Sequence, residues 1–163
     1  MNKTNLKLLA DWLIKNNVSL VLAEAFCMES FRADLVGGLD AVEFKSTTAC
    51  GTVGCALGWA PASEIPELAP IDSDYIGNSH YPSPPRILGF FKYCDRVFGL
   101  NINTCRGEYD WDWCFSGEWS DFDNTPKGAG IRILYLLDGL VTDNWFEDYE
   151  AAVPKYTEWY GIR

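Results

Sequence analysis

The sequence predicts a mainly α-helical fold, and a few short strands leave an α+β arrangement open as the alternative. Residues 4–15 and 125–139 place apolar side chains at helical spacing and carry signals for helix starts. Residues 61–85 hold six of the eight prolines and almost no periodic pattern, which predicts a long Pro-rich surface loop. With 163 residues, 48% of them hydrophobic, the chain can bury a core of its own. We therefore expect a compact single domain over residues 1–163.

The N-terminal segment predicts an amphipathic helix followed by a short strand. Leu6, Leu9 and Leu13 recur at helical spacing, and Thr4 is the expected cap residue. Residues 18–23, with the sequence VSLVLA, are rich in apolar and β-branched side chains, which favours a short strand.

The middle of the chain predicts two further helices. One runs from Thr52, its expected N-cap, to Trp59. Pro61 ends this helix, because a proline disfavours helical geometry in the residue before it. The other includes residues 86–98, where apolar side chains share one face, and Gly99 supplies its stop.

The C-terminal third contains the clearest helix signal of the chain. Thr125 is the expected N-cap, Pro126 occupies the first helical position, and Gly139 follows the end. Residues 144–160 predict further helical turns, with a break at Pro154. The apolar stripe expected on the helix after Thr125 consists of Gly130, Ile133, Leu134, Leu137 and Leu140.

Charge and hydropathy narrow the class of partner. The chain has 13 basic and 23 acidic residues, a net charge of −10, whereas a protein that binds nucleic acid needs a basic surface. No apolar run reaches membrane-spanning length, and charged residues interrupt the N-terminal Leu-rich stretch, so we expect no signal peptide. We therefore expect no direct nucleic-acid partner, no membrane partner and a cytoplasmic location, where the six cysteines are reduced thiols.

Residues 49–61, with the sequence ACGTVGCALGWAP, contain two cysteines whose spacing matches no standard metal or redox site. Cys50 and Cys55 are separated by four residues, and the other cysteines form no second close pair. A zinc site needs closely matched pairs of ligands, and a thioredoxin-type pair has two intervening residues. With one histidine in the chain, we expect neither a bound metal nor a cofactor.

Two interpretations of this segment remain. In one, Cys50 is a nucleophile, because the start of a helix lowers the pKa of a thiol, and His80 is the only imidazole that could act as its base. In the other, Gly54 and Gly58 form a helix face without side chains that lets another element approach closely, and Cys55 fills space as a small hydrophobe. Because three glycines within eight residues cost helix stability, a packing requirement explains the segment better.

Residues 108–123 interleave aromatic and acidic side chains, with six acids and no base. An extended segment would place Trp111 and Trp113 on one face, whereas a helix would bring Trp111 toward Trp119 in four-residue steps. Buried aromatic rings explain the pattern as core. Alternatively, the three indoles form a stacking pocket for a nucleobase, with Arg96 as a partner for the phosphate.

The chain resembles an uncharacterised family of small phage and bacterial proteins over about residues 50–140. Members share a Cys-Gly-Thr-x-x-Cys-x-x-Gly-Trp core, a downstream Leu/Phe-Gly-Leu, a Phe-x-x-x-Trp and a final amphipathic helix. The corresponding positions here are residues 50–59, Phe98-Gly99-Leu100, Phe115 with Trp119, and the segment from Thr125. The resemblance implies a phage or prophage accessory protein, but it supplies no established activity and no catalytic residue.

These observations together predict a non-enzymatic phage-type accessory protein that binds a host molecule in the host bacterial cytoplasm, as in counter-defence. It would either sequester a small nucleotide-like signal or block a host protein that carries a basic patch. The alternative is a cysteine-dependent hydrolase or transferase that uses Cys50 or Cys55. The sequence leaves the oligomeric state open.

Overall fold

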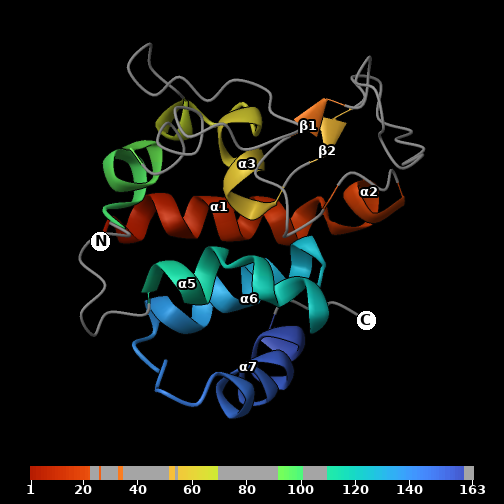
Figure 1. Cartoon of the computed structure of the whole chain (residues 1–163), viewed down its shortest axis with the longest axis vertical. Helices are drawn as coiled ribbons and strands as arrows, with labels where there is room; N and C mark the ends of the chain where they lie inside the picture. The colour runs from red at the N-terminus through yellow and green to blue at the C-terminus, as the bar shows by residue number, and fades with distance from the viewer. Residues whose placement is uncertain are drawn as a thin grey trace.

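The computed structural model describes a mainly helical protein (Figure 1). Most of the predicted Pro-rich loop lies outside the described residues, as do Cys50, Gly54 and His80. The residues that the structure describes are 1–22, 26, 33–34, 52–53, 55–69, 92–100 and 110–159.

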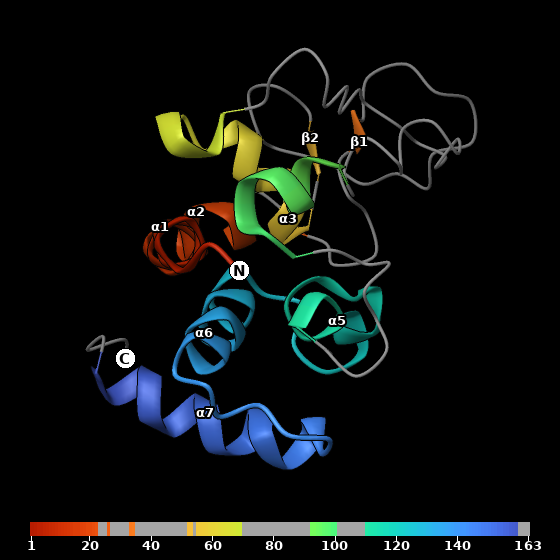
Figure 2. The same cartoon turned by 90° about the vertical axis from the view of Figure 1, so that its left-hand side faces the viewer.

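Helix α6 (Pro126–Leu137) lies between α1 (Lys3–Lys15) and α7 (Trp145–Trp159), and α5 (Asp110–Phe115) packs beside it (Figures 1 and 2). Residues 128–136 of α6 are all buried. The predicted apolar stripe was therefore too narrow, because this helix has neighbours on several sides rather than one solvated face.

The predicted ends of α6 are confirmed. The Thr125 hydroxyl accepts a hydrogen bond from the Gly128 N–H at 2.9 Å, and Pro126 occupies the first turn. After the helix, Gly139 has a φ of +70°, a conformation that suits glycine. Leu140, which was expected in the buried stripe, is 39% exposed because it follows this turn.

Helix α1 carries the predicted core face but a different cap. Leu6, Leu9 and Leu13 are fully buried, as predicted. The N-cap is Asn2 instead of Thr4, and its side chain accepts a hydrogen bond from the Asn5 N–H at 3.2 Å. Thr4 lies inside the first helical turn.

The predicted strand at residues 18–23 is wrong, because this segment forms helix α2 (Asn17–Leu22). The Asn17 side chain accepts a hydrogen bond from the Lys127 N–H at 3.0 Å, at the start of α6. This bond joins α2 to α6, so contacts distant in sequence override the β-branched composition.

The predicted helix from Thr52 to Trp59 is shorter than expected. Residues of β2 (Thr52–Val53) pair antiparallel with β1 (Ala33–Asp34), so Thr52 is no helix cap. Helix α3 (Ala56–Trp59) begins after Cys55, whose side chain makes no capping bond. The wider prediction of a few short strands stays a prediction.

Pro61 was predicted to end the helical conformation, and this prediction is wrong. It occupies the first turn of a 3₁₀ helix, η1 (Ala60–Ala62), which continues directly from α3, and Ala60 has helical φ and ψ. A proline is tolerated in a first turn, where its missing N–H would have no helical partner. A second such turn, η2 (Pro66–Leu68), follows.

Residues 92–98 are helical and end at Gly99, as predicted. Gly99 has a φ of +63°, and a Cβ atom there would lie 3.1 Å from the backbone nitrogen of Met1. The Asn2 N–H donates to the Phe98 carbonyl at 2.6 Å, so this turn holds the N-terminal residues of the described chain.

Helix α7 continues through Pro154, so the predicted break is wrong. Proline removes the hydrogen bond to the carbonyl four residues earlier, here that of Glu150. Both Pro154 and Glu150 are exposed, so water can satisfy that carbonyl.

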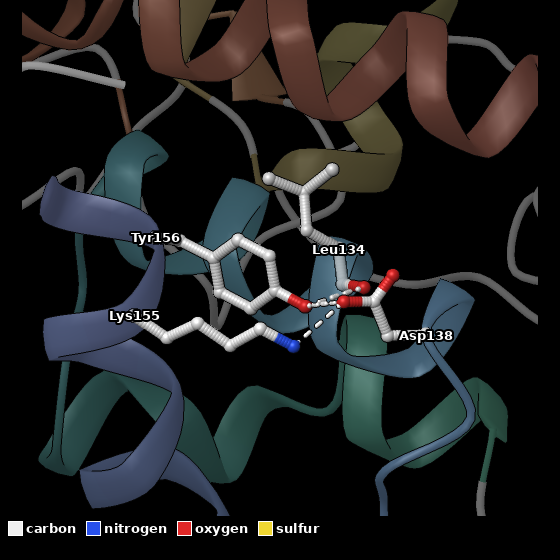
Figure 3. Close-up of polar contacts among 4 residues, drawn as sticks. All are labelled: Leu134, Asp138, Lys155 and Tyr156. Carbon is white, nitrogen blue, oxygen red and sulfur yellow. Dashed lines mark hydrogen bonds and ion pairs between the residues drawn. The ribbon is translucent and has the colours of Figure 1, made fainter. Parts of the chain in front are cut away.

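Polar contacts join α7 to the C-terminal end of α6 (Figure 3). The Tyr156 hydroxyl lies 2.5 Å from the Asp138 carboxylate and 3.2 Å from the Leu134 carbonyl. The Lys155 ammonium donates to the same carboxylate at 2.8 Å. These contacts fix the second half of α7 against α6.

Candidate functional site

The three indoles predicted as a stacking surface are buried. Trp111, Trp113 and Trp119 are 8%, 0% and 4% exposed. Trp111 and Trp113 lie on helix α5, so the extended alternative for this segment is wrong. Trp111 contacts Phe115 edge to face, with ring centroids 6.2 Å apart, which is the four-residue step expected of a helix.

Two of the residues predicted to contact a nucleotide lie in different environments, because Trp113 is in the core and Arg96 is on the surface. The Trp113 indole N–H donates to the Arg132 carbonyl at 2.7 Å inside the core. Arg96 is exposed on the 92–98 helix, where it donates to the Ala69 carbonyl at 3.2 Å and lies over the Tyr93 ring. Stacking of a base on these rings, with Arg96 at a phosphate, stays a prediction.

An aromatic pocket lies between η4 (Gly117–Asp121) and the start of α7. It has a volume of about 150 Å³. Phe122 and Phe146 meet edge to face at 4.4 Å, and they are 53% and 59% exposed. We call this site the aromatic pocket, and it is lined by Glu118, Trp119, Phe122, Trp145 and Phe146.

Local hydrogen bonds position the wall of the pocket that comes from η4. The Ser116 hydroxyl accepts from the Glu118 N–H at 3.3 Å and caps the 3₁₀ turn. The Trp119 indole N–H donates to the Asp112 carbonyl at 3.3 Å, which anchors the ring to α5. The indole of Trp119 is stacked on that of Trp145, with ring centroids 5.7 Å apart.

The wall from α7 depends on the turn before that helix. The buried carboxylate of Asp148 accepts from the Thr142 N–H at 2.6 Å, and the Thr142 hydroxyl accepts from the Asn144 N–H at 3.2 Å. These bonds satisfy backbone groups around the start of α7. They therefore fix the position of Trp145 and Phe146.

The surroundings of the aromatic pocket are acidic. Glu118, Asp121, Asp143, Glu147 and Glu150 are exposed acidic residues on the segments that supply the described lining, whereas the basic residues of this part of the chain are Lys127, Arg132 and Lys155. Burial, and then the negative charge of Glu118, raises the pKa of the Asp112 carboxyl above its ordinary value. Crowded carboxylates of this kind attract cations and repel phosphate groups.

One cation, Arg132, lies behind the pocket. It is fully buried, and its guanidinium carbon lies 4.4 Å from the centroid of the Trp119 ring. One terminal nitrogen donates to the Asp123 carbonyl at 3.4 Å, but Nε and the second terminal nitrogen find no hydrogen-bond acceptor among the described residues. Burial lowers the pKa of Arg132 to about 10, and Tyr149 and Asp123 oppose this shift.

The Asp123 carboxylate offsets the charge of Arg132. It accepts hydrogen bonds from the hydroxyls of Thr125 and Tyr149, and Tyr149 lies beside Arg132. The charge of Arg132 is thus balanced by that of Asp123. It therefore does not cancel the negative charge of the exposed carboxylates near the pocket.

Three of the six cysteines lie among the described residues. Cys55, Cys94 and Cys114 are buried, and burial raises the pKa of the Cys94 and Cys114 thiols. Because the candidate nucleophile Cys50 and its base His80 lie outside the described residues, the alternative of cysteine catalysis stays a hypothesis. Within the described ranges, no three His, Cys, Asp or Glu residues are grouped closely enough to hold a metal ion.

Of the residues predicted from the sequence to contact a ligand, Trp119 lines the aromatic pocket, whereas Trp111, Trp113 and Arg96 are not part of its described lining. The sequence did not predict Phe122, Trp145 or Phe146 as ligand contacts. The available signal was the repeated pattern itself: residues 145–148, Trp-Phe-Glu-Asp, again place aromatic side chains beside acidic ones.

Comparisons with protein-family models, with curated proteins and with solved structures found no match to this chain. In the part of the chain that the structure describes, no helix has the length and apolar character needed to cross a membrane.

Proposed function

We propose that this protein is a non-enzymatic binding protein that holds a cationic side chain of a basic partner protein in the aromatic pocket. The observation that supports this most is the lining itself, to which the described residues contribute four aromatic rings and one carboxylate, Glu118, within an acidic part of the chain. The faces of aromatic rings attract cations, and the attraction grows when the cation leaves water.

The acidic side chains around the pocket favour a protein partner over a small cation. Asp121, Asp143, Glu147 and Glu150 are all exposed on the segments that form the pocket. A single small cation would meet one or two of them, whereas a basic patch would meet several at once. Complementary charge of this kind accelerates association and selects among partners.

The resemblance to phage proteins extends this proposal to the biological setting. The partner would be a host protein with a basic patch, and occupying that patch would block it in counter-defence. For the other predicted occupant, a nucleotide-like signal, the acidic surroundings are unfavourable because they repel phosphate.

Calorimetric titration with a lysine-rich peptide tests the proposal. We expect binding at an ionic strength of about 0.01 M that weakens severalfold at about 0.15 M, where the Debye length falls from about 30 Å to about 8 Å. Glu118→Gln should weaken binding about threefold, since exposed ion pairs are worth roughly 0.2–1 kcal/mol.

Glu67→Gln is the matched control, because Glu67 is exposed on η2, away from the pocket lining. It should leave the affinity within error of wild type. No binding of the basic peptide at low ionic strength, or equal losses in both variants, would contradict the proposed function.

A further inference from the structure

We infer that the group held by the aromatic pocket is the trimethylammonium head of a trimethylated lysine on the partner protein. This inference rests on the proposed function and specifies its ligand. Three features of the pocket carry it: its size, its shortage of hydrogen-bond acceptors, and the exposed aromatic rings that remain available for a cation.

The pocket has the volume of a compact, rounded group. At about 150 Å³ it equals the size of cavity that accommodates a benzene molecule. A nitrogen with three methyl groups is a compact body of similar bulk. A whole nucleotide would not fit.

The lining can satisfy few hydrogen-bond donors. An unmodified lysine ammonium has three N–H donors and a guanidinium has five. Among the described residues of the lining, Glu118 supplies the only side-chain carboxylate, so an N–H that turns toward the rings loses its bond to water. A trimethylammonium group has no N–H donor, keeps its full charge and presents methyl groups to the rings.

The four rings differ in what they offer to a cation. The guanidinium of Arg132 already lies over Trp119, so that indole has less attraction for a second positive charge. Trp145 is half-buried, stacked on Trp119 and in edge-to-face contact with Trp113, whereas Phe122 and Phe146 are more than half exposed. We therefore expect Phe122 and Phe146 to provide the cation–π contacts, with Glu118 supplying charge.

Calorimetry with four forms of one basic peptide tests this assignment. The central residue is lysine, trimethyllysine, arginine, or the neutral side chain in which carbon replaces the trimethylated nitrogen. We expect the trimethyllysine form to bind about tenfold more tightly than the lysine and arginine forms, and at least about threefold more tightly than the neutral form.

The outcomes separate this inference from the proposed function. Equal affinity for the lysine, arginine and trimethyllysine forms would overturn the inference while leaving the proposed function standing. Equal affinity for the neutral and trimethylated forms would also overturn it, because the pocket would then select apolar bulk. Failure of every peptide to bind would contradict both. Choline that binds as tightly as the trimethyllysine peptide would overturn the assignment to a lysine side chain.

Variants of one exposed ring separate aromatic attraction from apolar contact. Phe146→Leu keeps an apolar side chain but removes the ring, and we expect it to weaken binding of the trimethyllysine peptide about three- to tenfold. Phe146→Tyr keeps an aromatic ring and should keep the affinity of wild type. Val18→Ala, at a position that is 66% exposed on α2, is the control and should change nothing. Unaltered affinity in Phe146→Leu, with its fold verified by circular dichroism, would overturn the role of the rings.

Discussion

The two sides of helix α6 contact different kinds of side chains. Toward α1, the contact is close and made of small and aliphatic groups: a Cβ atom on Gly130 would lie 2.7 Å from the Ile14 side chain and 2.9 Å from the Ala10 carbonyl. Toward α5, η4 and α7, the contact consists of large rings, hydroxyl groups and the buried cation Arg132.

The difference locates the candidate function. Close aliphatic packing stabilises the fold and leaves no group available to a ligand. At the edge of the aromatic side Phe122 and Phe146 are more than half exposed, and they line the aromatic pocket together with the carboxylate of Glu118. Exposed rings and a carboxylate are groups that a cationic ligand can contact, so we place binding on this side.

The largest expected effect comes from adding bulk between α1 and α6. Gly130→Val should lower the free energy of unfolding by about 3 kcal/mol and Gly130→Ala by less, because the Ala10 carbonyl belongs to the backbone and cannot move aside. Thermal melts of both variants measure this. If Gly130→Ala raised the melting temperature, as the usual helix preference for alanine would do, the close approach would be disproved.

A second large effect is expected on the aromatic side. Arg132→Met keeps most of the buried volume but leaves the Asp123 carboxylate without its counter-charge and removes the contact over Trp119, so we expect destabilisation of about 2 kcal/mol. Arg132→Lys keeps the charge but loses the planar contact with Trp119, so it should destabilise less. Denaturant titration compares the three proteins. Unchanged or greater stability in Arg132→Met would show that the interaction of the guanidinium with Asp123 and Trp119 does not stabilise the fold.

The sequence predicted the parts of the fold that local chemistry determines. Thr125, Pro126 and Gly139 specify the ends of α6 through their own side chains and backbone preferences. Residues 18–23 became a helix instead of a strand, because α2 is held by α6, and Pro154 did not break α7, because the freed carbonyl is exposed. Contacts between distant segments are invisible to a reading of local periodicity.

The candidate site was only half predictable for the same reason. The acidic and aromatic composition of residues 108–123 marked one wall, and Trp119 was named. The other wall depends on how α7 returns across η4, which brings Phe146 against Phe122. No local pattern encodes that return.

A smaller effect concerns the polar contacts of Figure 3. Hydrogen bonds from Lys155 and Tyr156 lower the pKa of the Asp138 carboxyl below its ordinary value of 3.8. A lowered pKa stabilises the fold above the ordinary value, and this contribution is lost as the pH falls through the lowered pKa. Asp138→Asn should therefore cost about 0.5 kcal/mol at neutral pH, because the side chains are partly exposed.

Melts across pH check this expectation. The difference between wild type and Asp138→Asn should be constant at neutral and mildly acidic pH and should shrink below about pH 4. Tyr156→Phe, which removes one of the two donors, should show a smaller difference with the same pH dependence. A difference that persisted undiminished at the lowest pH would mean that the carboxylate charge is not its source.

The smallest expected effect tests the acidic surroundings of the pocket. Burial and the charge of Glu118 raise the pKa of Asp112, so its ionised form costs stability at neutral pH, and this cost vanishes as the pH falls through the raised pKa. Asp112→Asn should stabilise the protein by no more than about 0.5 kcal/mol at pH 7 and should lose that advantage in acid. The gain should be smaller in a Glu118→Gln background, because one source of repulsion is already absent.

Asp112→Asn should also weaken binding of the basic peptide slightly, since the Asp112 carboxylate adds to the negative potential near the pocket. Stabilisation that is identical with and without Glu118 would mean that burial alone raises this pKa, and that the carboxylates near the pocket do not act together on a cation.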